Sequence, residues 1–149
     1  MIEGNTTGDL STDALLGKYL NKFPERIPVV WDAFKLGRAA IVGSDYTLRD
    51  SQTEIIKLEL SKVMAAKTIG YLEGAADELE ANGITADYFH DLSEAWGFIL
   101  SLQYTDWFSN SDANTMLQEL DAGNGFWDRT AAELDAMAAQ ILAITGPLN

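Results

Sequence analysis

The single histidine of the sequence, His90, and the acid Glu94 are spaced so that they could share one chemical task. In a helix, side chains four residues apart lie one turn apart on the same face. An imidazole and a carboxylate in this arrangement can bind one metal ion. Two ligands do not hold an ion tightly, so a complete site would need further carboxylates or ligands from another chain. The residues leave an alternative open, in which His90 is hydrogen-bonded within a polar core layer.

Small residues beside this pair predict a close contact between helices. Ser93, Gly97 and Ser101 recur every fourth residue and form a ridge of small side chains. We therefore expect the His90 and Glu94 side chains to point inward, with Ser93, Gly97 and Trp96 packed around them.

Signatures of common catalytic sites are missing from the sequence. There is no nucleophile elbow, no phosphate-binding loop with its lysine and no ordered calcium loop. Acidic residues are numerous, but their number does not show the placement that a glycosidase requires. The sequence therefore predicts no catalytic residues, and it favours a protein that is not an enzyme.

Two polar segments each carry a pair of large aromatic residues. Trp107 and Phe108 precede a short predicted helix, and Phe126 and Trp127 follow it. Such residues either form a surface for a partner or ligand or close the end of a helical bundle. Both interpretations remain open.

The elements that must position these residues are predicted to be helices. Polar composition predicts a flexible tail over residues 1–11, and apolar periodicity predicts a single helical-bundle domain over residues 12–149. The expected fold is an all-α bundle of about four main helices plus short helices. Caps, prolines and glycines place the predicted helices at residues 12–23, 29–42, 48–81, 86–104, 113–120 and 131–145.

The longest predicted helix carries a seven-residue repeat that is typical of a helix–helix seam. Its principal positions are Leu58, Ala65, Leu72 and Leu79, and its paired positions are Ile55, Ile69 and Ala76. Lys62 interrupts this stripe, and we expect it to extend to solvent or to pair with a glutamate.

The net charge of −13 is concentrated in one half of the chain. Met1–Gly70 contains nine acidic and nine basic residues, whereas Tyr71–Asn149 contains fourteen acidic residues and one basic residue. Such a surface repels phosphate backbones, which argues against nucleic-acid binding. No run reaches the roughly 18 apolar residues of a membrane span, and the absence of cysteine excludes disulfides and thiolate metal sites.

Three segments of the chain resemble a known family. His90-Asp91-Leu92-Ser93-Glu94-Ala95-Trp96-Gly97-Phe98-Ile99, followed by Ser101-Leu102, resembles a signature helix of imelysin-like proteins. More narrowly, it is similar to a bacterial family of exported lipoproteins of unknown function. Lys35–Ile41 and Gly125–Asp128 are similar to further segments of that family.

The resemblance implies an extracytoplasmic protein, periplasmic or associated with the outer membrane, built from two helical-bundle halves. This chain is similar to the C-terminal half. The resemblance implies a binding protein for a divalent metal ion or iron, with His90 and Glu94 as part of an incomplete site. The implied partner is the N-terminal half of the parent protein or a second copy of the chain. The alternative is a non-catalytic structural or protein-interaction module with a packed polar core layer.

Overall fold

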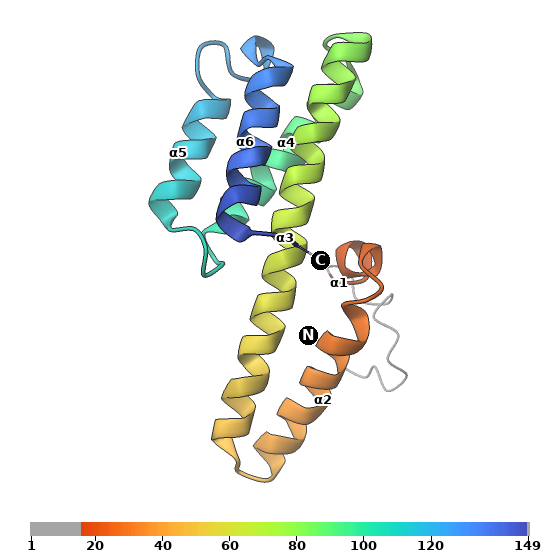
Figure 1. The fold of residues 1–149 in the computed structure, drawn as a ribbon, viewed down its shortest axis with the longest axis vertical. Coiled ribbons are helices and arrows are strands. Elements are labelled where there is room, and N and C mark those ends of the chain that lie inside the picture. The colour runs from red at the N-terminus through yellow and green to blue at the C-terminus, as the bar shows by residue number, and fades with distance from the viewer. Residues whose placement is uncertain (1–15, 149) are drawn as a thin grey trace. The chain divides into compact units, whose positions relative to one another are not determined.

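The computed structural model describes residues 16–148, whose regular elements are all helical (Figure 1). This confirms the all-α prediction, while the predicted tail at residues 1–11 lies outside the described residues. The elements are α1 (Leu16–Tyr19), the 3₁₀ helix η2 (Leu20–Lys22), α2 (Ile27–Val42), α3 (Tyr46–Asn82), α4 (Ala86–Leu102), α5 (Asn110–Leu120), the 3₁₀ helix η3 (Gly125–Asp128) and α6 (Ala131–Thr145).

The chain divides into two compact units, and the boundary falls within α3. Unit 1 ends at Val63 and unit 2 begins at Met64. The sequence predicted a single domain over residues 12–149, and the two units are described separately below.

Unit 1 is a hairpin of α2 and the first part of α3, joined by a short turn (Figure 1). Ser44 adopts a positive φ of 58° in this turn, and the Asp45 carboxylate accepts a hydrogen bond from the backbone N–H of Leu48. The core of the unit is small. Its buried cluster comprises Leu20, Val30 and Val63, and the partly buried side chains packed against it are Tyr19, Phe23, Ile27, Trp31 and Phe34.

A buried ion pair joins the residue that precedes α2 to α3. The Arg26 guanidinium donates to Glu59 Oε2 at 2.6 Å, and Lys62 Nζ donates to Glu59 Oε1 at 2.8 Å. Lys62 therefore pairs with a glutamate, which is one of the two outcomes predicted for it. The seven-residue stripe on α3 is less uniform than predicted, because Ala65 and Leu72 are buried in unit 2 while Ile55 and Leu58 are exposed in unit 1.

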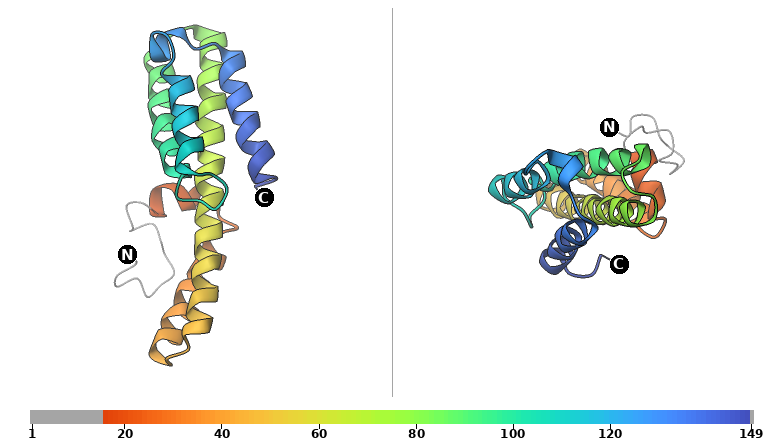
Figure 2. Two further views of the ribbon diagram at one scale, coloured as in Figure 1. Left: turned by 90° about the vertical axis from the view of Figure 1, so that its left-hand side faces the viewer. Right: turned by 90° about the horizontal axis from the view of Figure 1, so that it is seen from above.

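Unit 2 packs the second part of α3 with α4, α5 and α6 around a larger core (Figure 2). The large side chains that are completely or almost completely buried there are Leu72, Tyr88, Leu92, Ile99, Leu102, Leu120, Leu134 and Ile141. Tyr88 is the one polar aromatic among them. Its hydroxyl donates to the carbonyl oxygen of Phe126 at 2.7 Å, which satisfies the buried polar group.

The helices of unit 2 begin at residues that satisfy their first N–H groups. Thr85 caps α4, and Thr130 and Glu133 form the predicted capping box of α6. A second capping box, made by Ser109 and Asp112, starts α5 at Asn110, three residues before the predicted start.

Candidate functional site

His90 lies on the exposed side of α4, whereas we expected it to point inward. The buried stripe of this helix consists of Tyr88, Leu92, Ala95, Ile99 and Leu102. His90 lies outside this stripe and is exposed. Glu94 is half-buried at the edge of the stripe. The structure therefore corrects the prediction of an inward imidazole, because the apolar residues that fill the core are displaced around the helix from the His90 position.

The ridge of small residues on α4 is also open. Ser93 and Gly97 are exposed, and a Cβ atom added at Gly97 would meet no atom within 4 Å. Trp96 is partly buried and packs against the core of unit 2. Within residues 64–148, no helix of unit 2 covers Ser93 and Gly97, so the predicted packing of these residues around a site stays a prediction.

Metal ligands do not gather around His90 within the described chain. Among residues 16–148, no group of three or more histidine, aspartate or glutamate side chains is placed to hold an ion. Any ion bound by His90 and Glu94 would need ligands from elsewhere. Their role as part of an incomplete metal site therefore stays a prediction.

The α3–α4 interface of unit 2 brings Asp91 against a glycine. A Cβ atom added at Gly74 would lie 2.9 Å from Asp91 Oδ2, so a side chain at position 74 would displace this carboxylate. Burial raises the pKa of Asp91 above its ordinary value. The positive charges of His90 and Lys67 oppose this shift in pKa, and the negative charges of Asp87 and Glu78 reinforce it.

Further polar and aromatic contacts continue along the same two helices. Lys67 Nζ lies 4.3 Å from the centre of the Tyr71 ring, which stacks on Phe98 at 5.7 Å between ring centres. Towards the α3–α4 turn, Thr85 Oγ1 donates to Glu78 Oε1 at 2.7 Å. These contacts hold α3 and α4 together. None of them pairs a nucleophile with a base in an arrangement suited to catalysis.

The four aromatic residues singled out in the sequence do not form one surface. The two segments that carry them lie at opposite ends of α5 (Figure 2). Phe108 is buried, and Trp107 and Phe126 pack against the core of unit 2. Trp127 alone is largely exposed, at 63%, with its ring 4.7 Å from that of Phe89.

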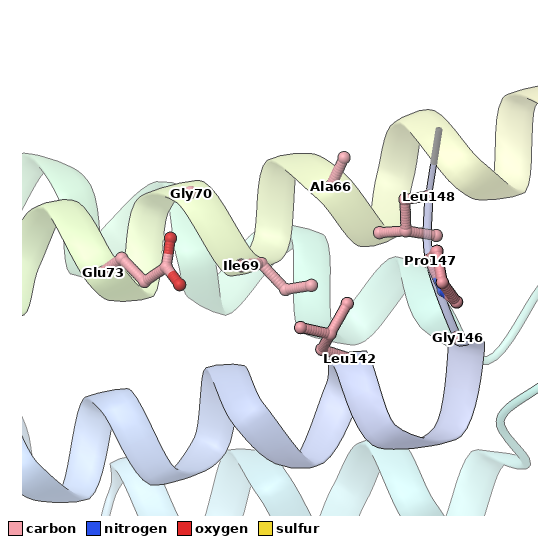
Figure 3. Close-up of a pocket in the computed structure, with 8 residues that line it drawn as sticks. All are labelled: Ala66, Ile69, Gly70, Glu73, Leu142, Gly146, Pro147 and Leu148. Atoms are coloured by element: carbon pink, nitrogen blue, oxygen red, sulfur yellow. The ribbon is translucent and has the colours of Figure 1, made fainter.

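A groove that sequence reasoning missed lies between α3 and α6 in unit 2 (Figure 3). Its volume is about 480 Å³, and its lining is apolar apart from one carboxylate. The residues that line it are Ala66, Ile69, Gly70, Glu73, Leu142, Gly146, Pro147 and Leu148. Gly70 on α3 and the apolar end of α6 are visible in the sequence, but nothing in the sequence shows that these two helices are neighbours.

The groove presents apolar side chains and one carboxylate. Figure 3 shows Ile69 and Leu142 facing one another from the two helices, with the Glu73 carboxylate towards one end and the Gly146–Leu148 segment at the other. A Cβ atom added at Gly70 would meet no atom within 4 Å, so this part of the wall is open. Its lining therefore offers apolar contacts and one negative charge.

Comparisons with known proteins assign a family but no activity. A family model described as "Domain of unknown function (DUF4856)" matches residues 5–146. No curated protein and no solved structure matches the chain. None of the helices within residues 16–148 combines the length and apolar character that crossing a membrane requires.

Proposed function

We propose a function for this chain, which belongs to the DUF4856 family of unknown function: it is a non-catalytic module that binds a basic, amphipathic helix of a partner protein. The observation that carries the proposal is the α3–α6 groove, which is apolar along its length and has one carboxylate, that of Glu73. A groove of about 480 Å³ has room for several apolar side chains but not for a whole helix. The partner would therefore lay one face of its helix on the groove.

Charge supports a basic partner. Residues 64–148 contain fourteen acidic and two basic residues, and Glu73 places one of these carboxylates at the groove itself. A lysine or arginine beside the apolar residues of the partner helix would meet Glu73, while the surrounding negative potential would accelerate association. An acidic helix would be repelled by the same charges.

The test uses a synthetic helical peptide of leucine and lysine whose binding to the full chain is followed by fluorescence anisotropy. Gly70→Leu should weaken binding at least tenfold, because its side chain occupies the open groove; a tenfold loss corresponds to about 1.4 kcal/mol. The matched control is Gly97→Leu on α4, which is also a helical glycine with open space around it. Binding that is unchanged by Gly70→Leu, or equally weakened by Gly97→Leu, contradicts the proposal.

A second pair of variants tests the charge of the groove. Glu73→Gln should weaken binding of the lysine peptide several-fold, whereas Glu119→Gln on α5 removes the same charge away from the groove and should have little effect. A peptide with glutamate in place of lysine should not bind. Equal effects of the two variants would show that only the overall charge of the protein attracts the peptide.

The finer implications of the resemblance are proposals as well. They are the relation to imelysin-like proteins, the extracytoplasmic location and the association of His90 and Glu94 with a metal ion or iron. Their support is the likeness of segment 90–102 to the signature helix. Fractionation of cells that express the native gene tests the location, since recovery with cytoplasmic markers alone would contradict it.

A further inference from the structure

The hairpin of unit 1 leaves large apolar side chains exposed on both of its helices. On α2, Val29 and Leu36 are 44% and 45% exposed, and Ile41 and Val42 at the end of the helix are exposed as well. On α3, Tyr46 at the start of the helix is exposed, and further along Ile55 and Leu58 are 38% and 47% exposed. Few large side chains in the unit are fully buried, so this exposed apolar surface is large in proportion to its core.

Helix geometry places Val29, Leu36, Ile55 and Leu58 on the same side of the hairpin; Ile55 is included because it lies about one turn before Leu58. The two helices are antiparallel neighbours, since a Cβ atom at Gly37 would lie 3.4 Å from Gln52 Cβ and Arg26 binds Glu59. Val29 and Leu36 are one position before Val30 and Gly37, and Leu58 is one position before Glu59. In two antiparallel helices, the residues one position before those that face the other helix all lie on the same side of the pair.

The opposite side of the hairpin is covered in part, near η2. Trp31, one position after Val30, belongs with Phe34 to the residues packed around Leu20 of η2. Within residues 16–148, no comparable buried cluster includes Val29, Leu36, Ile55 and Leu58, which we call the open face of unit 1.

We infer that the open face of unit 1 binds the same face of a second copy of the chain. Two identical faces related by a twofold axis form a closed interface, here an arrangement of four helices. Charge permits this pairing, since residues 16–63 contain eight basic and six acidic residues. Lys35 pairs with Asp32 at 2.7 Å and Lys57 with Glu54 at 3.4 Å, so the helices that carry the open face present both signs of charge. Two copies of unit 2, with fourteen acidic and two basic residues, would instead repel one another.

Sedimentation velocity of the full chain between 1 and 100 μM, at about 0.15 M salt, tests the inference. The mass should rise from 16.3 kDa towards twice that value as concentration increases. The double variant Leu36→Gln and Leu58→Gln should raise the dissociation constant at least tenfold. Circular dichroism should show unchanged helicity, because both side chains are exposed.

The matched control is the double variant Leu100→Gln and Ile144→Gln, which replaces exposed apolar residues of unit 2. It should dimerise like the wild type, and so should Gly70→Leu, since the groove is not part of this interface. A wild type that is monomeric at 100 μM overturns the inference. It is also overturned by a dimer that only the control variant dissociates, or by an open-ended series of larger species.

A covalent trap provides a second measurement. The chain contains no cysteine, so Leu58→Cys introduces a single thiol on the open face. Mild oxidation should convert this variant to a disulfide-linked dimer faster than Leu100→Cys, the matched control on α4. Equal rates for the two variants would contradict the inferred interface.

Discussion

Asp91 holds its carboxylate where Gly74 of the neighbouring helix has no side chain. Burial raises its pKa above the ordinary value of 3.8. The folded state therefore binds a proton at Asp91 more tightly than the unfolded state. This contribution to stability is present below pH 3.8 and is lost as the pH rises through the folded pKa. At neutral pH the ionised Asp91 consequently destabilises unit 2.

Replacing Asp91 should therefore stabilise the protein at neutral pH. We expect Asp91→Asn to raise the melting temperature by about 2 °C at pH 7, because the residue is only half-buried, and by less at pH 3. Thermal unfolding followed by circular dichroism measures both values. Asp77→Asn on exposed α3 surface is the control for the loss of one negative charge. An equal gain in the control, or a gain that grows at pH 3, would contradict this explanation.

Replacing His90 tests the hypothesis that the chain contributes to a metal site. If His90 and Glu94 share an ion, calorimetric titration with Zn²⁺ should release heat that His90→Ala abolishes, because an imidazole and a carboxylate are its ligands. Affinity should be modest, since residues 16–148 supply no third ligand in reach. Negligible heats for both the wild type and His90→Ala would contradict the hypothesis that the chain alone binds an ion through His90 and Glu94.

The sequence was informative about some single residues and not about others. Lys62 could be assigned a glutamate partner, because Glu59 lies one turn away on the same helix. The direction of His90 could not be predicted, because the apolar residues around it are compatible with more than one buried stripe. Tyr88, whose hydroxyl suggests exposure, is buried because Phe126 presents a carbonyl group 38 positions away in the sequence.

At the scale of elements, the Arg26–Glu59 pair stabilises the α2–α3 hairpin. Burial alone would raise the pKa of Glu59, but hydrogen bonds from Lys62 and Arg26 outweigh this effect and lower it below 4.5. The stability that the ionised Glu59 contributes is therefore present above pH 4.5 and is lost as the pH falls through the folded pKa. Lowering the pH through the folded pKa of Glu59 should therefore destabilise the α2–α3 hairpin.

Glu59→Gln should destabilise unit 1 by about 2 kcal/mol at pH 7, because it removes the buried counter-charge of the Arg26 guanidinium and leaves the exposed Glu25, at 3.5 Å. Trp31 is the single tryptophan before residue 64, so fluorotryptophan NMR during urea unfolding can follow unit 1 by itself. Glu54→Gln removes an exposed carboxylate paired with Lys57 and should cost less than about 0.5 kcal/mol. Equal losses in the two variants would contradict the proposed role of burial.

Helix boundaries were predictable where a capping residue stands in front of an apolar pattern. Thr85 and Thr130 gave the starts of α4 and α6. The start of α5 was missed because its capping box uses aspartate, Asp112, in place of the more familiar glutamate. The seven-residue stripe on α3 predicted Ala65 and Leu72 correctly, but periodicity shows only that a stripe is apolar. It does not show which part of the stripe is covered, and Ile55 and Leu58 are not.

At the scale of the whole molecule, composition and periodicity were sufficient to predict an all-α protein with an acidic C-terminal half. They could not predict the α3–α6 groove, which depends on contacts between residues far apart in the sequence. The separation of the two aromatic segments by α5 follows from the helix between them, but the burial of Phe108 and the exposure of Trp127 depend on tertiary packing.

Arg129, the sole basic residue after Gly70, donates hydrogen bonds to the backbone and lies 3.9 Å from the Glu133 carboxylate. Its guanidinium donates to the carbonyl oxygens of Glu119 at 2.7 Å and Ala122 at 2.8 Å, where it closes the end of α5. Since that cation is committed to a helix terminus, the surface of the C-terminal half behaves as a polyanion whose counter-ions come from the solvent. Low ionic strength should therefore increase the repulsion among the acidic residues of the C-terminal half, and added salt should screen this repulsion.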